Sequence, residues 1–108
     1  MSKDLVSVYT TLPDRESVDR LARLLVEERL AACANFFPLE SVYRWKGKLE
    51  KASEWALILK TRRGLYEAVE RRIRDAHPYD VPAVVAYDIT AGLPDYLAWI
   101  GESTRAPS

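Results

Sequence analysis

The stretch from Cys33 to Thr61 constrains the fold of this chain more than any other. Gly47 is its only glycine, and the residues on both sides are aromatic, β-branched or alternate with charge. This pattern is typical of a β-hairpin, which we expect to turn at Lys46-Gly47-Lys48. Each arm holds about a dozen residues, whereas ordinary strands have about five or six. The arms should therefore extend beyond a small domain, and a partner should cover Tyr43 and Trp45.

The segments around this hairpin alternate between strand and helix patterns. Asp14 is well placed to cap the first helix, and apolar side chains follow it at helical spacing. Pro38 cannot donate to a strand ladder and should mark a bulge or a bend in the first arm. The expected elements are a strand Leu5–Leu12, a helix from Asp14 to near Leu30, the hairpin, a helix capped by Thr61 that runs to Ala76, a strand Ala83–Ile89 and a helix Asp95–Ser103.

The order of these elements is β-α-β-β-α-β with a terminal helix, which predicts an α+β chain of one domain, residues 1–108. A right-handed crossover followed by a hairpin gives the split βαβ arrangement of the ferredoxin-like fold. Helices then cover one face of the sheet, while the other face and the long hairpin need a partner. A closed cyclic homo-oligomer is the natural way to supply one.

Charge and cysteine content limit the partners of the chain. Sixteen basic and sixteen acidic residues cancel, so there is no broad electrostatic attraction for nucleic acid or an anionic membrane surface. No apolar run has the length of a membrane span, and the first residues lack the apolar segment of a secretory signal. One cysteine excludes an intrachain disulfide and indicates a reducing compartment. We therefore expect a cytoplasmic protein without nucleic-acid or membrane partners.

Five sequence blocks carry a resemblance to a known family. They are Leu30–Asn35 (LAACAN), Ser41–Lys48 (SVYRWKGK), Lys60–Arg62 (KTR), His77–Pro82 (HPYDVP) and Pro94–Ile100 (PDYLAWI). Together they resemble the CutA divalent-cation tolerance proteins, and the similarity runs from about Val6 to Thr104. The resemblance implies a ferredoxin-like homotrimer, in which long hairpins of neighbouring subunits join edge to edge. It also implies a link to the tolerance of copper and other divalent metals in bacteria.

One position departs from the family pattern. The family often has Asn before the proline that opens the last helix, and this chain has Leu93. Leucine is a poor helix cap, so the sequence defines the start of the last helix less sharply than the family pattern does.

Cys33 and His77 are the candidate metal ligands, because copper favours thiolate and imidazole ligands. They are the only cysteine and the only histidine of the chain, so a complete site needs carboxylates, water or a second subunit. The alternative for Cys33 is a small buried strand residue beside Ala32 and Ala34. The alternative for His77 is a scaffold role, with its ring hydrogen-bonded to backbone in a rigid prolyl loop.

A candidate ligand cleft combines basic and polar residues from two parts of the chain. Lys60, Arg62 and Arg63 cluster where the hairpin ends and the second helix begins, and they could bind an anion there. Tyr79 and Asp80 could add a polar lining beside His77. The alternatives are a solvated basic rim and a solvated Asp80.

Tyr43, Trp45 and Trp55 are candidate anchors of a subunit interface, since aromatic residues dominate interface cores. They could also form a stacking platform for nucleic acid, but the absence of net charge argues against that interpretation.

The leading functional hypothesis is a non-enzymatic, homotrimeric divalent-cation tolerance protein that binds copper or similar metal ions weakly. The alternative is a trimeric small-ligand sensing module like the PII signalling proteins, by analogy of fold alone. A hydrolase or lyase that uses His77 is the third hypothesis. The sequence lacks a nucleophile elbow, a phosphate-binding loop and a pair of catalytic acids, so catalysis has no motif to support it.

Overall fold

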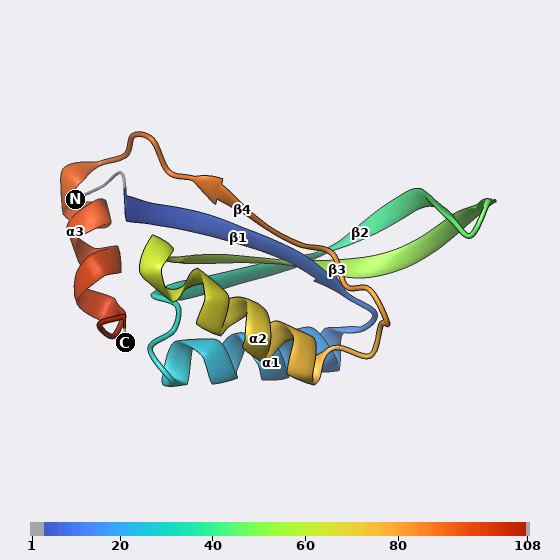
Figure 1. Ribbon diagram of the computed structural model, residues 1–108, viewed down its shortest axis with the longest axis horizontal. Helices are drawn as coiled ribbons and strands as arrows, with labels where there is room; N and C mark the ends of the chain where they lie inside the picture. The colour runs from blue at the N-terminus through green and yellow to red at the C-terminus, as the bar shows by residue number, and fades with distance from the viewer. Residues whose placement is uncertain (1–3, 108) are drawn as a thin grey trace.

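The computed structural model describes residues 4–107, which form one antiparallel sheet and three α-helices (Figure 1). The sheet order is β2-β3-β1-β4, and each neighbouring pair is antiparallel. This order confirms the split βαβ arrangement of the ferredoxin-like fold. The elements are β1 (Leu5–Leu12), α1 (Arg15–Glu27), β2 (Cys33–Trp45), β3 (Lys48–Arg62), the 3₁₀ turn η2 (Arg63–Leu65), α2 (Tyr66–Ala76), β4 (Val84–Asp88) and α3 (Pro94–Ser103).

Helices α1 and α2 cover one face of the sheet (Figure 1). The alternation of side chains along β1 and β3 explains why, because Val6, Val8 and Leu12 of β1 share this face with Leu57 and Leu59 of β3. The core between these layers consists of Val6, Val8, Leu12, Val18, Leu21, Ala22, Leu25, Leu30, Ala31, Leu57, Leu59, Leu65, Val69 and Ile73. On the opposite face of the sheet, α3 packs on Leu5 at one end, while Val85 and Tyr87 are exposed.

The hairpin formed by β2 and β3 projects from this body to one side (Figure 1). Its pairing runs without interruption from Cys33 opposite Lys60 to Trp45 opposite Lys48. Lys46 and Gly47 both have positive φ, at 52° and 79°, as the two central residues of a type I′ turn require. The predicted hairpin and its turn are confirmed, and the molecule measures 43 × 25 × 23 Å.

The prediction of a bulge at Pro38 is wrong. Phe37, Pro38 and Leu39 pair in succession with Ala56, Trp55 and Glu54, so neither strand has an extra residue. Strand β2 lies at the edge of the sheet. Proline is compatible with an edge strand wherever its missing N–H would point away from the neighbouring strand.

Helix α1 begins as predicted and ends earlier. Asp14 caps it, with its Oδ1 accepting a hydrogen bond from the Ser17 N–H at 2.8 Å. The helix ends at Glu27 instead of near Leu30, because Arg29 adopts a left-handed conformation with a φ of 58°. The Leu30 N–H then donates to the Leu25 carbonyl at 3.0 Å. The expected signal for such an end is glycine, and its absence explains the error.

The prediction that Thr61 caps the second helix is also wrong. Thr61 is buried inside β3, and its Oγ1 donates to the Leu30 carbonyl at 2.6 Å. Strand β3 continues to Arg62, and η2 leads into α2 without a side-chain cap. Thr61 therefore ties the strand to the segment after α1.

Helix α3 packs at the end of the sheet that lies farthest from the hairpin tip (Figure 1). Its Ile100 is buried with Leu5 and Ala32, in a cluster separate from the main core. The helix has Pro94 in its first turn, and its N-cap residue Leu93 makes no side-chain hydrogen bond. No helix of the described chain is long and apolar enough to cross a membrane.

Candidate functional site

A hollow of about 740 Å³ lies at the base of the hairpin, on the sheet face opposite α1 and α2. Three strands and the loop before β4 contribute to it, because alternate residues of neighbouring strands point to the same face. Its lining residues are Tyr9, Thr11, Glu40, Ser41, Val42, Tyr43, Trp45, Glu54, Tyr79, Asp80, Val81 and Ala83. Among these described residues, three are acidic and none is basic.

Glu54 contributes a buried carboxyl group to this hollow. It is only 7% exposed, yet it carries a carboxyl group in the middle of β3. The Ser41 hydroxyl donates to its Oε1 at 2.6 Å, and the Tyr79 hydroxyl donates to its Oε2 at 2.9 Å. Both oxygens thus accept hydrogen bonds, as an ionised carboxylate does.

Glu54 does not appear among the functional residues that we predicted from the sequence. It stands in a run of charged and small residues, which is typical of a solvated strand. One signal was available: Ala56 and Ile58 continue the same side of β3, so Glu54 extends an apolar face toward the hairpin. Its hydroxyl donors are 13 and 25 residues away in the chain, and only the tertiary structure brings them together.

The buried carboxylate affects the phenols beside it. Burial raises the pKa of Tyr79 to about 12, and its hydrogen bond to Glu54 adds to the rise. Burial also raises the pKa of Tyr9, with the charge of Glu54 as a second cause. Both phenols therefore keep their protons at neutral pH, and Tyr79 remains a hydrogen-bond donor.

His77 holds the loop that covers this hollow. Its Nε2 is hydrogen-bonded to the Thr11 carbonyl and must be the donor, because a carbonyl only accepts. Its Nδ1 then accepts from the Tyr79 N–H at 3.2 Å, and the two rings lie 4.7 Å apart. Both ring nitrogens are thus engaged, which favours the scaffold interpretation of His77. A metal ion could bind Nδ1 only by displacing the Tyr79 N–H.

Cys33 lies at the other end of the sheet from His77. It pairs with Lys60, which pairs with Ser7, whereas His77 contacts Thr11. Four residues along β1 correspond to about 13 Å, so one chain does not bring the two predicted metal ligands together. Within residues 4–107, no group of three or more His, Cys, Asp or Glu side chains is placed to hold a metal ion.

The surroundings of Cys33 differ from the fully buried site that we considered as an alternative. The thiol is partly exposed, and its Sγ lies 3.6 Å from the Tyr96 hydroxyl. The contact with Cys33 is the first cause that raises the pKa of Tyr96 to about 12, and burial adds to it. Tyr96 in turn stacks on Trp99, with 5.6 Å between ring centroids.

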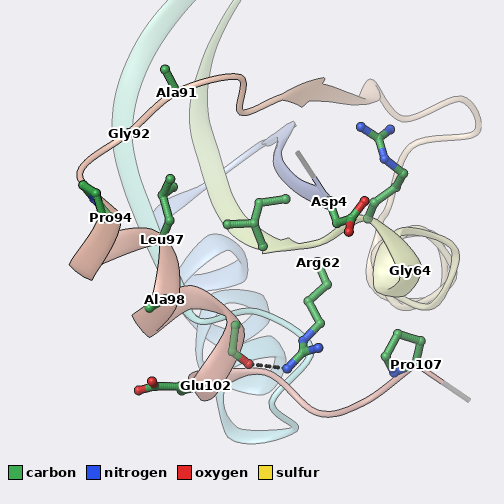
Figure 2. Close-up of a pocket in the computed structure, with 13 residues that line it drawn as sticks. Asp4, Arg62, Gly64, Ala91, Gly92, Pro94, Leu97, Ala98, Glu102 and Pro107 are labelled. Atoms are coloured by element: carbon green, nitrogen blue, oxygen red, sulfur yellow. Dashed lines mark hydrogen bonds between the residues drawn. The ribbon is translucent and has the colours of Figure 1, made fainter. Parts of the chain in front are cut away.

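The predicted basic cluster borders a second hollow, of about 980 Å³, between β3, η2 and α3 (Figure 2). The Arg62 Nε donates to Thr104 Oγ1 at 2.9 Å, and its Nη2 donates to the Gly101 carbonyl. Arg63 forms an ion pair with Asp88, and Lys60 donates to Asn35 Oδ1 at 3.4 Å. Each of these cations has a partner in its own chain, so the cluster ties β3 to the elements around it.

The predicted ligand cleft is therefore split within the chain. Tyr79 and Asp80 line the hollow at the hairpin, Arg62 lines the hollow at α3, and Lys60 lines neither. Arg62 follows Lys60 at one end of β3, whereas the loop with Tyr79 crosses the sheet nearer the hairpin. The number of residues between Arg62 and Tyr79 in the sequence does not indicate how far apart they lie in the fold.

The three predicted interface aromatics fall into two classes. Tyr43 and Trp45 are 44% and 41% exposed on the projecting hairpin. Trp55 instead packs against the core of its own chain, with the Phe36 ring 6.2 Å away and the Arg15 guanidinium 6.0 Å from its centroid. The argument for an interface role therefore holds for Tyr43 and Trp45 and is lost for Trp55.

Comparisons with known proteins place this fold in a family. A family model described as the CutA1 divalent ion tolerance protein matches residues 6–103. The divalent-cation tolerance protein CutA of Pyrococcus horikoshii is 45% identical over 101 residues, which cover 94% of this chain and 99% of that protein. The chloroplastic protein CutA of Arabidopsis thaliana is 48% identical, and the match covers 93% of this chain but 56% of that longer protein.

Solved structures agree with the sequence matches. The crystal structure of CutA1 from Oryza sativa superposes with a TM-score of 0.91 at 42% identity, covering 97% of this chain and 98% of that one. The Archaeoglobus fulgidus structure, described as a periplasmic divalent cation tolerance protein CutA, superposes with a TM-score of 0.89 at 39% identity, covering 92% and 97%.

These names contradict the predicted cytoplasmic location. The Arabidopsis and rice relatives are called chloroplastic, and the Archaeoglobus structure is called periplasmic. A single cysteine is compatible with each of these compartments, so the inference from cysteine content to cytoplasm was wrong.

The family resemblance that the sequence blocks indicated is confirmed by these matches. All five blocks, from Leu30 to Ile100, lie within the residues that the family model covers. The matches to whole archaeal proteins and to solved structures extend over more than nine-tenths of the chain. This chain belongs to the CutA1 divalent ion tolerance protein family.

Proposed function

We propose that the protein is a homotrimer that binds copper or similar divalent metal ions weakly and acts in the response to metal ions by binding, without catalysis. The projecting hairpin carries this proposal, because Tyr43 and Trp45 have no core of their own chain to enter. The family name supplies the link to divalent-cation tolerance.

Two further features support an assembly of several subunits. The sheet face opposite α1 and α2 exposes Val85 and Tyr87, and strand β2 lies at the edge of the sheet along its thirteen residues. Natural proteins cover such edges and apolar faces. A closed ring of identical subunits covers both at once. Three subunits are what the family resemblance implies.

The proposed metal site would be completed between subunits. Cys33 is the more available ligand of the two candidates, because its thiol is partly exposed and its contact with Tyr96 is long. His77 would have to release the Tyr79 N–H before Nδ1 could bind a metal ion. A single thiolate or imidazole with additional oxygen ligands holds copper weakly, and this agrees with the weak binding that we propose.

A copper titration of the assembled protein tests the metal proposal. We expect Cu²⁺ binding that weakens as the pH falls, since a protonated imidazole cannot bind a metal ion. His77→Ala should reduce the affinity for Cu²⁺, and Cys33→Ser should reduce the affinity for Cu⁺. If both variants titrate like the wild type, neither residue is a ligand and this proposal fails.

Small-ligand sensing is the second candidate function. The hollow at the base of the hairpin favours it, because this hollow has a buried polar group and aromatic walls, as ligand sites commonly do. The fold analogy with trimeric signalling proteins adds little, since one fold hosts many functions.

A further inference from the structure

Among residues 4–107, no cationic side chain forms an ion pair with the buried carboxylate of Glu54. The ion pairs among the described residues join Arg20 to Glu16, Arg23 to Asp19, Arg63 to Asp88 and Arg72 to Glu28, and none includes Glu54. Its hydrogen-bond partners, Ser41 and Tyr79, are neutral hydroxyls. A buried charge without a counter-charge is costly, so proteins usually pair it.

The walls around this carboxylate are aromatic. Tyr9, Tyr43, Trp45 and Tyr79 all line the same hollow. The face of an aromatic ring attracts a cation, and this attraction grows when the site excludes water. Trp45 already has such a contact on its ring, with the Lys46 Nζ 5.8 Å from the centroid.

A carboxylate at the bottom of an aromatic hollow selects a particular chemistry. An organic nitrogen cation can donate hydrogen bonds to the carboxylate and place its carbon atoms against the rings. An anion is disfavoured, because Glu54 and Asp80 line the hollow and none of its described lining residues is basic. The argument rests on Glu54, since the Glu40 carboxylate accepts from Ser53 and lies on the other face of β2.

We propose that this hollow binds an organic nitrogen cation, an ammonium or guanidinium group, through the carboxylate of Glu54. Two sources supply that chemistry: a free small amine, or a lysine or arginine side chain of a second copy of this chain. The proposal does not rest on metal binding, because Cys33 and His77 lie outside the lining, and His77 contacts the hollow through the lining residues Thr11 and Tyr79.

Titration with butylammonium chloride tests the first source. The readouts are the NMR shifts of the Trp45 indole N–H and of the Tyr79 backbone N–H in the intact assembly. We expect saturable shifts with butylammonium and none with butanol or with sodium chloride of equal ionic strength. This comparison uses only the wild type, so it does not depend on the folding of a variant.

Glu54→Gln then tests the carboxylate itself. The amide has the same shape and keeps an acceptor, but it has no charge, so the affinity for butylammonium should fall at least tenfold. Glu27→Gln is the matched control, because Glu27 is exposed on α1, outside the hollow, and its replacement removes the same charge. The control should bind butylammonium like the wild type.

Dilution of the assembly tests the second source, a lysine or arginine side chain of a second copy of this chain. If a neighbouring subunit already fills the hollow with a cationic side chain, butylammonium will not bind the wild type. Sedimentation of Glu54→Gln should then show association at least tenfold weaker than that of the wild type and of Glu27→Gln. The proposal is overturned if butylammonium does not bind and the association is unchanged. It is equally overturned if the Glu54→Gln change abolishes binding of Mg²⁺ or Cu²⁺ while butylammonium has no effect.

Discussion

The charged residues toward the two ends of strand β3 differ in their bonding partners. At the α3 end, Arg62 bonds to Thr104 and Gly101, and Arg63 pairs with Asp88; Figure 2 shows Arg62 beside α3. At the hairpin end, Glu54 is buried with neutral hydroxyls, and Trp45 is exposed beyond it. The arginines at the α3 end have bonding partners within their own subunit. At the hairpin end, the exposed Trp45 and the charge of Glu54 would gain partners from an additional molecule.

We therefore expect the two ends of β3 to have different roles: one in the folding of the subunit and the other in association. Changes at the α3 end should alter the stability of each subunit and leave assembly intact. Changes at the hairpin end should alter assembly or binding first. The predictions that follow test this division, beginning with the largest expected effect.

Val42→Pro should have the largest effect, because it removes a backbone donor from the free edge of β2. The two-residue turn makes Trp45 and Lys48 a hydrogen-bonded pair, so pairs with Tyr43 and Ser41 follow in alternation. The Val42 N–H then points away from β3. Position 38 faces the same way, which explains why β2 tolerates Pro38, a residue without an N–H. The hairpin should survive the change, while the trimer fails to form at micromolar concentration.

Light scattering and circular dichroism measure these two outcomes of Val42→Pro together. Val42→Thr is the control, since it keeps the N–H and the branched side chain. A Val42→Pro protein with the mass and melting temperature of the wild-type trimer would show that this edge does not take part in assembly.

Trp45→Ala should weaken assembly by about 2 kcal/mol or more if this ring anchors a subunit interface. The melting temperature of the wild type should also rise with protein concentration, because assembly stabilises the folded state by mass action. Sedimentation equilibrium gives the association constant. An unchanged constant for Trp45→Ala would place the interface anchor elsewhere.

Arg62→Met should destabilise the subunit by about 1.5 kcal/mol, because two hydrogen bonds from a charged, partly buried group are lost. The trimer mass should not change. Arg20→Met is the control: its ion pair with Glu16 is long and exposed, so its loss should cost close to nothing. Urea unfolding measures both. Dissociation of Arg62→Met without loss of subunit stability would contradict the division between the two ends.

Tyr79→Phe should have a characteristic effect in alkali. The folded pKa of Tyr79, about 12, lies above its unfolded value of 10.0. The folded state therefore holds this proton more tightly, and the resulting stability is complete below pH 10 and is lost as the pH rises through 12. Tyr79→Phe should flatten the fall in stability between these values, measured by urea unfolding at each pH. Tyr87→Phe is the control, and equal curves for both variants would exclude the bond between Tyr79 and Glu54 as the cause.

Most of the secondary structure could be predicted from local sequence. Asp14 indicated the start of α1, and Gly47 between two extended runs indicated the turn. These signals are reliable because a cap or a turn is formed by residues a few positions apart. The end of α1 was missed because Arg29 takes a left-handed conformation that usually belongs to glycine.

The sequence by itself determined the order of the elements, the long hairpin and the family, since periodicity, turn residues and ordered motifs are local properties. Only the tertiary structure decided what the charged residues do. Arg62 became a link to α3, and Glu54 became a buried carboxylate between Ser41 and Tyr79. The physical reason is that the environment of a charge depends on burial and on partners from distant parts of the chain, and strand pairing brings those partners together.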